Sequence, residues 1–134
     1  MVKLKLIILT ICFTGILMAC KHQLKTTTAT VVENKTHNGP ISQGQIINIE
    51  YKVTNTGKEK LVISDIQTTC GCISIDYKKE TIPPGKSSLL NFKFDTSLNK
   101  GQVEYEIFLY GNFDSTFVYR LTFEANIIDK NTSD

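Results

Sequence analysis

The sequence has few of the residues from which most enzyme and metal sites are built. Its 134 residues include only two histidines, and its four cysteines are widely scattered apart from one close pair. No Gly-rich phosphate loop, H-E-x-x-H motif or nucleophile-elbow serine occurs. A zinc site needs four ligands, and the chain offers few beyond that cysteine pair. These absences argue against a hydrolase and indicate no resident cofactor.

A lasting excess of positive charge is also missing. The formal net charge of +2 comes from Lys3 and Lys5, which lie in a leading segment without acids. Without residues 1–19, the Lys and Arg count falls from 15 to 13, which matches the 13 Asp and Glu residues. Few basic residues interleave with the aromatic ones, as a base-stacking surface would require. The sequence therefore predicts no nucleic-acid partner.

The leading segment predicts an export signal. After the two lysines, residues 6–18 are almost wholly apolar, and the small residue Ala19 follows. This run is shorter than the ~20 residues that span a membrane comfortably. A charged start, a short apolar run and a small residue before the cut are typical of a signal peptide, here residues 1–19.

The end of that segment, Leu17-Met18-Ala19-Cys20, resembles the lipobox of bacterial lipoproteins, although Met18 departs from the commonest residue there. The resemblance implies that Cys20 is lipidated and anchors the chain in a membrane, firmly if it carries two or three acyl chains. Residues 21–25 carry no acid, which favours a periplasm-facing place in the bacterial cell envelope. Two alternatives are a retained anchor helix and an ordinary secretory cut that leaves Cys20 a plain cysteine.

The rest of the chain alternates apolar and polar residues with a period of two, and no segment has the period of a helix. We expect a lipidated Cys20 and flexible Thr-rich tether over residues 20–28, a β domain over 29–129 and a disordered tail over 130–134. About seven short strands are typical of an all-β, immunoglobulin-like two-sheet sandwich. The runs are Val31–Val32, Ile47–Val53, Leu61–Ile66, Cys70–Ile75, Leu90–Phe94, Val103–Leu109 and Phe117–Ile127.

Turn residues separate these runs. Residues 55–58 predict a tight turn in which Gly57 takes a positive φ, and Pro83-Pro84-Gly85 predicts another.

Three pieces in this order resemble the DUF1573 family, over roughly residues 28–128. They are Asn55-Thr56-Gly57 before Leu61-Val62-Ile63, then Thr69-Cys70-Gly71-Cys72, then Ile82-Pro83-Pro84-Gly85 leading to Phe94-Asp95-Thr96 and Gly101. Ile73 departs from the threonine that the family often has after its C-G-C. The resemblance implies an immunoglobulin-like sandwich, similar to ASH and major-sperm-protein modules, and supports an envelope location. It implies no reaction.

Cys70 and Cys72 are the only pair with chemical character. In a strand, residues two apart share a face, and Gly71 would let the backbone bend so that the sulfurs meet. Three interpretations stay open: a structural or inert pair, a redox-labile disulfide, and a weak candidate for a soft-metal site such as Cu(I). The two histidines, His22 and His37, are interpreted as solvated residues.

The sequence thus predicts a non-enzymatic, lipid-anchored envelope protein. It would bind or scaffold an unknown protein or glycan through sheet edges and end loops. The alternative is a thiol redox or copper site at Cys70 and Cys72.

Overall fold

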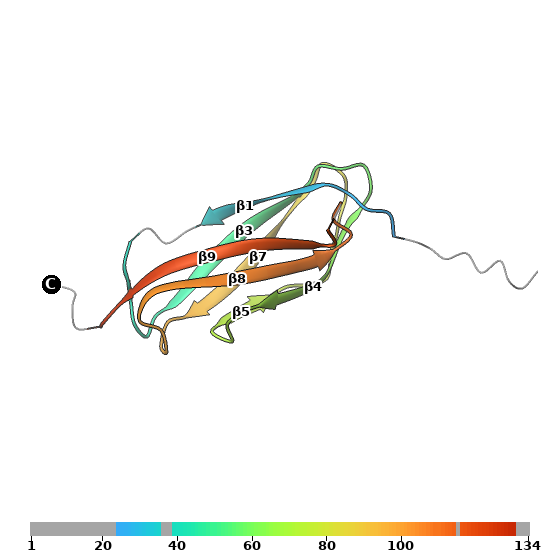
Figure 1. Cartoon of the computed structure of the whole chain (residues 1–134). Coiled ribbons are helices and arrows are strands. Elements are labelled where there is room, and N and C mark those ends of the chain that lie inside the picture. The colour runs from blue at the N-terminus through green and yellow to red at the C-terminus, as the bar shows by residue number, and fades with distance from the viewer. Residues whose placement is uncertain (1–23, 36–38, 115, 131–134) are drawn as a thin grey trace, which may run out of the picture.

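The computed structural model describes residues 24–35, 39–114 and 116–130, and these form nine strands and no helix (Figure 1). The all-β prediction is confirmed. Two strands of only two residues, β2 and β6, are too short to give an alternating pattern and were not predicted. The strands are β1 (Ala29–Lys35), β2 (Ile41–Ser42), β3 (Ile46–Asn55), β4 (Leu61–Thr68), β5 (Ile73–Asp76), β6 (Thr81–Ile82), β7 (Ser87–Asp95), β8 (Gly101–Gly111) and β9 (Val118–Ile128).

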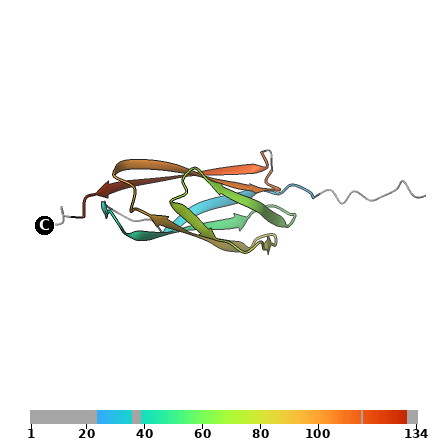
Figure 2. The same ribbon diagram turned by 90° about the horizontal axis from the view of Figure 1, so that it is seen from below.

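The strands form two sheets that pack face to face (Figure 2). One sheet has the order β1-β3-β7-β5, and the other has the order β2-β9-β8-β4-β6. All pairs are antiparallel except β2 with β9, which is parallel. The described chain enters at one end of the sandwich and finishes β9 at the opposite end (Figure 1). We call the first of these the N-terminal end and the second the far end.

The core lies between the sheets and is built by the predicted alternation. Along β7, for example, Leu90, Phe92 and Phe94 are fully buried, while the residues between them are exposed. The Phe94 ring packs edge-on against Tyr105 and Phe123, with ring centroids 5.8 and 5.2 Å apart. Burying a side chain of this size stabilises the fold by roughly 1.5–3 kcal/mol, so the aromatic cluster ties the two sheets together.

Of the flexible tether predicted for residues 20–28, the described residues 25–28 are instead docked on the sandwich. Thr27 is buried, its N–H donates to the carbonyl of Asn112 at 2.8 Å, and its own carbonyl accepts from the Asp114 N–H at 2.8 Å. Thr28 likewise accepts from the N–H groups of Thr56 and Gly57. Threonine-rich composition predicted a solvated chain, but these threonines fill backbone hydrogen-bonding positions left by two loops.

Two buried asparagine side chains hold this end together. The Asn55 carbonyl oxygen accepts from the Thr27 hydroxyl at 3.0 Å and the Gly57 N–H at 3.1 Å. Its amide nitrogen donates to the backbone carbonyls of Glu59 and Ile82 at 2.7 and 2.9 Å. Both N–H donors and both lone pairs of this fully buried amide are thereby used.

Asn112 plays the matching role one loop away. Its carbonyl oxygen accepts from the Val62 N–H at 2.7 Å, and its amide donates to the carbonyls of Lys25 and Lys60 at 2.6 and 2.8 Å. Lys25 is thereby fixed to the domain, four residues earlier than β1 begins.

Gly57 is needed for space and not for its backbone angle, which corrects the sequence prediction. The glycines with positive φ are Gly39, Gly44, Gly85 and Gly101, so the turn at Pro83-Pro84-Gly85 is as predicted and the one at Gly57 is not. A Cβ on Gly57 would collide with the Thr27 hydroxyl and lie 2.7 Å from the Thr28 nitrogen. The docked N-terminal segment therefore requires glycine here.

Phe117 does not belong to the last strand, contrary to prediction. It lies just before β9, has a φ of 56° and is 62% exposed. A positive φ is uncommon for a bulky aromatic residue. Its carbonyl accepts from the Gly111 N–H at 3.0 Å, which closes the loop between β8 and β9.

Several predicted features lie outside the described residues: the signal peptide (1–19), the lipidated Cys20, both histidines and most of the tail. In the part of the chain that is described, no helix is long and apolar enough to cross a membrane.

Candidate functional site

The two long sides of the sandwich differ. On one side the chain passes from β4 in one sheet to β5 in the other through residues 69–72, and we call this side the closed seam. On the opposite side β1 and β9 border the two sheets, and we call this side the open seam. Its two ends are covered, by the docked Thr27 at one and by β2 at the other.

Between those covers the outer edge of β9 has no neighbouring strand among the described residues. β2 reaches only Ile127 and Ile128. The Glu106 carbonyl in β8 accepts from the Thr69 N–H, and the Glu106 N–H donates to the Thr69 hydroxyl, so both backbone groups of Glu106 point away from β9. Glu106 and its β9 partner Thr122 therefore form a non-hydrogen-bonded pair. Antiparallel pairs alternate between the two kinds. The N–H and C=O groups of Arg120, Thr122 and Glu124 therefore point toward the open seam.

The other sheet edges are blunted in ways that discourage strand pairing. β5 has four residues and β6 has two. β6 covers only Leu61 and Val62 of β4, but β4 carries a register shift between Ile63 and Asp65, and β1 carries one between Glu33 and Lys35. β9 has eleven residues, no proline and ten regular pairs with β8. Short strands and bulges protect sheet edges from association, and a long regular edge is a template for it. β9 is the one long, regular edge in the described sandwich.

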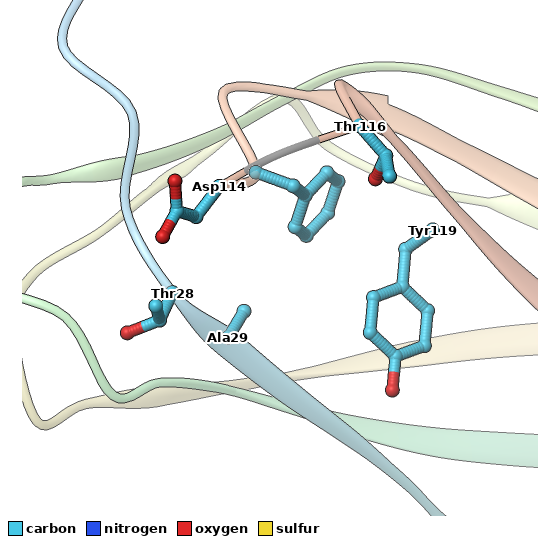
Figure 3. Close-up of a pocket in the computed structure, with 6 residues that line it drawn as sticks. Thr28, Ala29, Asp114, Thr116 and Tyr119 are labelled. Atoms are coloured by element: carbon cyan, nitrogen blue, oxygen red, sulfur yellow. The ribbon is translucent and has the colours of Figure 1, made fainter.

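A pocket of about 270 Å³ opens at the start of this edge (Figure 3). Ala29 of β1 and Tyr119 of β9 lie on opposite sides of it, and Asp114 and Thr28 border its outer part. The buried ring of Phe113 completes the wall. The lining is mixed apolar and polar, as in sites that hold one side chain of a partner.

Tyr51 spans the open seam from within. This β3 side chain donates from its hydroxyl to the Thr122 carbonyl at 3.4 Å, which links the two sheets behind the β9 edge. Burial, as the larger cause, and the negative charge of Glu33 together raise the pKa of Tyr51 to about 12. The phenol therefore stays protonated and keeps its donor at neutral pH.

Charged side chains flank the exposed centre of β9. Arg120 pairs with Glu106 across the sheet at 3.1 Å. Glu124 lies directly opposite Glu104, and both are exposed. Like charges facing each other on a sheet are mildly destabilising. The β9 edge is therefore acidic near Glu124, and it has a basic residue at Arg120.

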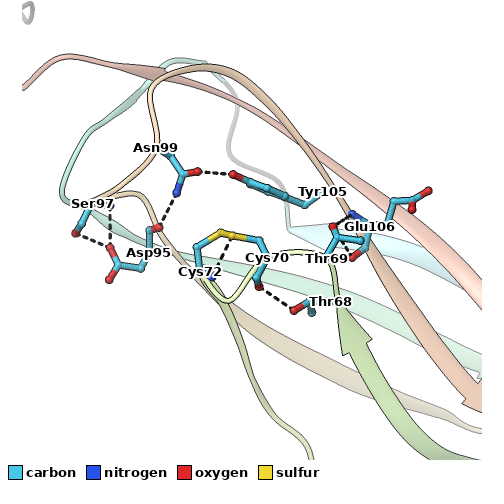
Figure 4. The surroundings of a disulfide bond; sticks show 9 residues. All are labelled: Thr68, Thr69, Cys70, Cys72, Asp95, Ser97, Asn99, Tyr105 and Glu106. Atoms are coloured by element: carbon cyan, nitrogen blue, oxygen red, sulfur yellow. Dashed lines mark hydrogen bonds between the residues drawn. A yellow bond between two sulfur atoms is a disulfide. The ribbon is translucent and has the colours of Figure 1, made fainter.

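The closed seam contains a disulfide between Cys70 and Cys72, whose Cα atoms are 5.1 Å apart (Figure 4). Both residues are half-buried, and Cys72 packs against the core. The Cys72 carbonyl accepts from the Asp95 N–H of the first sheet at 2.8 Å. Thr69, one residue before Cys70, bonds to Glu106 of the second sheet. The disulfide ring thus sits where the chain changes sheets.

The two cysteines lie in a turn and not in the extended strand that was predicted for residues 70–75. The strand begins at Ile73, whose N–H donates to the Cys70 carbonyl at 3.1 Å and closes the turn. The Thr68 hydroxyl donates to the same carbonyl at 2.9 Å. A two-residue separation brings the sulfurs together because the chain folds back here, not because they share a strand face.

A network of polar side chains lies in the neighbouring β7–β8 turn, at the far end of the sandwich. Tyr105 donates to Asn99, whose amide donates to the Asp95 carbonyl at 3.2 Å (Figure 4). The hydroxyl and the N–H of Ser97 donate to the Asp95 carboxylate at 2.6 and 2.9 Å and lower its pKa. These bonds shape the turn between β7 and β8.

No group of three or more His, Cys, Asp or Glu side chains in the described ranges is arranged to hold a metal ion. Sequence reasoning named sheet edges as contact sites but did not single out β9. The only available signal was the length of the run after Phe117 without proline or glycine.

Comparison with known proteins identifies the family. The model of the family described as "Protein of unknown function (DUF1573)" matches residues 29–127. The family resemblance noted from the sequence is thereby confirmed. A search of curated proteins finds no match.

Solved structures with a similar fold include a protein of unknown function from Porphyromonas gingivalis W83, with a TM-score of 0.63 and 15% identity. The match covers 82% of this chain and 51% of that one, so the chain spans about half the length of that protein. The human CEP192 ASH/PapD-like domain 7 gives a TM-score of 0.49, with 10% identity over 84% of this chain and 97% of that one. A CARDB domain from Pyrococcus furiosus gives 0.49, with 17% identity over 78% and 97%. The fold is an immunoglobulin-like two-sheet sandwich.

Proposed function

The chain belongs to the DUF1573 family, whose function is unknown, and on that premise we propose that it is a non-enzymatic, lipid-anchored binding module of the bacterial envelope. Its partner is an extended polypeptide segment that adds as a strand to the free edge of β9. The observation that carries this proposal is the long, regular β9 edge, which faces the open seam while the other sheet edges are short or bulged.

Strand addition uses the backbone for affinity and side-chain pockets for specificity. The outward N–H groups of Arg120, Thr122 and Glu124 and the carbonyls of Arg120 and Glu124 supply the first element, while the Thr122 carbonyl already accepts from Tyr51. The pocket beside Tyr119 supplies the second, because an added strand would place alternate side chains toward the gap between the sheets. Charged residues opposite Arg120 and Glu124 would set its register.

A different polypeptide fits this edge better than a second copy of the chain. Two β9 strands could pair antiparallel about Thr122, with Arg120 of each opposite Glu124 of the other. Such a pair would place the two N-terminal ends at opposite ends of the assembly. That arrangement conflicts with two lipid anchors at Cys20 in one membrane.

Photo-crosslinking in living cells tests the proposal. A benzoylphenylalanine at position 124 reports on the β9 edge, and one at Asn48, exposed on the other sheet, is the control. We expect a crosslinked protein adduct at 124 that survives Thr122→Val and is lost with Thr122→Pro. Proline removes a free edge N–H without removing a bond of the β8–β9 ladder, so the domain keeps its fold.

Equal adduct yields in the two Thr122 variants, or none above the Asn48 level, would overturn strand addition. An adduct with twice the mass of the chain would show self-pairing instead. If Thr122→Pro fails to fold by circular dichroism, Arg120→Pro is the second edge variant, because its N–H has the same orientation.

A further inference from the structure

We infer that the N-terminal end of the sandwich rests on the surface of the anionic bilayer that holds the lipid anchor. This inference rests on the lipid anchoring proposed above and adds an orientation to it. The end consists of residues 24–28, the β3–β4 loop 56–60, the β6–β7 turn 83–86, and residues 112–114 with 116–117. Hydrogen bonds between these segments hold them as one surface.

The reach of the anchor brings this end to the membrane. Lys25 is fixed to the domain because its carbonyl accepts from the Asn112 amide at 2.6 Å. Only five residue steps separate it from Cys20, and five extended residues reach at most about 17 Å. A lipid on Cys20 therefore keeps the N-terminal end within that distance of the headgroups.

Two large apolar side chains are exposed on this end. Leu24 is 51% exposed and Phe117 is 62% exposed. Phe117 also has a positive φ, a conformation that is costly for a bulky residue and clusters at sites with a function. Aromatic and leucine side chains that project from a protein surface insert into the headgroup region of a bilayer.

The charge of the surface fits an anionic bilayer. Four exposed lysines, Lys25, Lys58, Lys60 and Lys86, lie in the segments that form this end, against the acidic Glu59 and Asp114. Lys25 and Glu59 pair at 3.4 Å. The other three lysines outnumber Asp114, so this end has an excess of positive charge. The mature chain as a whole is close to neutral. Lysines near a negatively charged leaflet are attracted to it over about a Debye length.

The far end lacks this combination. Its described lysines, Lys100 and Lys130, are matched by Asp129, with which Lys100 pairs at 2.8 Å, and by Asp95 in the β7–β8 turn. Leu98 there is 96% exposed, and the two acids balance the two described lysines of this end. It therefore offers a matched control, an exposed apolar residue at the opposite end.

A single tryptophan can read the orientation because the chain has none of its own. We would purify the full lipoprotein, acylated at Cys20, with either Phe117→Trp or Leu98→Trp, and reconstitute each in vesicles of phosphatidylethanolamine and phosphatidylglycerol. Brominated lipids quench tryptophan that reaches the acyl region. We expect Trp emission at position 117 to shift to the blue and to be quenched, and that at 98 to remain as in water. Lys58→Glu with Lys60→Glu should lower the quenching at 117 by about twofold or more.

Acylated protein that floats with the vesicles but shows equal, unquenched emission at both positions overturns the inference and leaves the anchoring proposal intact. An intact mass without acyl chains overturns the anchoring and this inference with it. Equal quenching at both positions also overturns it, because the domain would then have no fixed end toward the bilayer.

Discussion

The two seams of the sandwich close by different means. At the closed seam the chain itself crosses between the sheets, and a disulfide joins Cys70 to Cys72 within that crossing. At the open seam no strand covers the middle of β9 among the described residues, and side chains join the sheets instead. Tyr51 reaches Thr122, and Asn55 holds Thr27 at the N-terminal end.

This difference shows that the seam with a covalent link need not contribute more to stability than the seam without one. A disulfide that encloses so few residues removes little entropy from the unfolded chain, whereas a buried amide with four partners leaves all of them unsatisfied when it is lost. Substitutions at the open seam should therefore lower the free energy of unfolding more than loss of the disulfide does. The open seam also has a long, regular strand edge for a partner.

The largest expected effect is at Asn55. Asn55→Ala removes four hydrogen bonds and leaves buried donors and acceptors without partners, which should lower the free energy of unfolding by about 3–4 kcal/mol. Urea unfolding followed by circular dichroism measures it. Asn48→Ala, exposed on the same strand β3, is the control and should change stability by less than about 0.5 kcal/mol. Similar losses for both would mean that the amide does not hold the open seam.

The next effect is a pH dependence at Tyr51. The folded pKa, about 12, lies above the ordinary value of 10, so the neutral phenol stabilises the fold fully below pH 10. That contribution is lost as the pH rises through 12, by up to about 2 kcal/mol. Because lysines titrate in the same range, the comparison is with Tyr51→Phe. The stability difference between wild type and variant should shrink between pH 9 and pH 12, and a constant difference would contradict the argument.

A smaller effect is expected at the disulfide. Cys70→Ala with Cys72→Ala should leave the domain folded and cost roughly 1.5 kcal/mol. The backbone bonds of the turn, from Ile73 to Cys70 and from Asp95 to Cys72, do not need the sulfurs. Urea midpoints of the double variant and of Asn55→Ala give the ranking directly. A larger loss at the cysteines would reverse the comparison of the seams.

The smallest effect is local, at Asp95 beside the closed seam. The Ser97 hydroxyl and N–H lower the pKa of its carboxyl below the ordinary 3.8. Any stability that this provides is present above that value and is lost as the pH falls through the folded pKa. An NMR titration should place the Asp95 midpoint below 3.8, and Ser97→Ala should move it upward. An unchanged midpoint in Ser97→Ala would assign the shift to another cause.

Most of the fold could be predicted because period-two alternation directly encodes which face of a strand is buried. Ile49, Tyr51 and Val53 are buried as their spacing predicts, and so are Leu90 and Phe92. The family could be predicted because its motifs are short and ordered. Alternation carries no information about the strands of two residues or about which strand lies at a sheet edge, so the open seam required the structure.

Two of the local errors have a common cause. Thr27 and Gly57 were assigned from their neighbours in sequence, but their structure is decided by groups far along the chain. Thr27 docks on Asn112, and Gly57 makes room for Thr27 and Thr28. Contacts of this range are invisible to propensity and spacing. Cys70 and Phe117 were instead assigned to strands, but each lies in a short turn or loop that a bond from Ile73 or Gly111 closes.

The first and last described residues lie at opposite ends of the sandwich, and this placement has a mechanical consequence. β9 runs from the N-terminal end to the far end, so a partner strand added to its edge would lie along the line between the proposed membrane surface and the far end. Ladder hydrogen bonds lie perpendicular to the strands. Tension along that line would load these bonds together in shear, whereas tension across it would open them one after another like a zipper. A lengthwise strand pair of this kind resists force best in the direction in which a tethered protein is pulled away from its membrane.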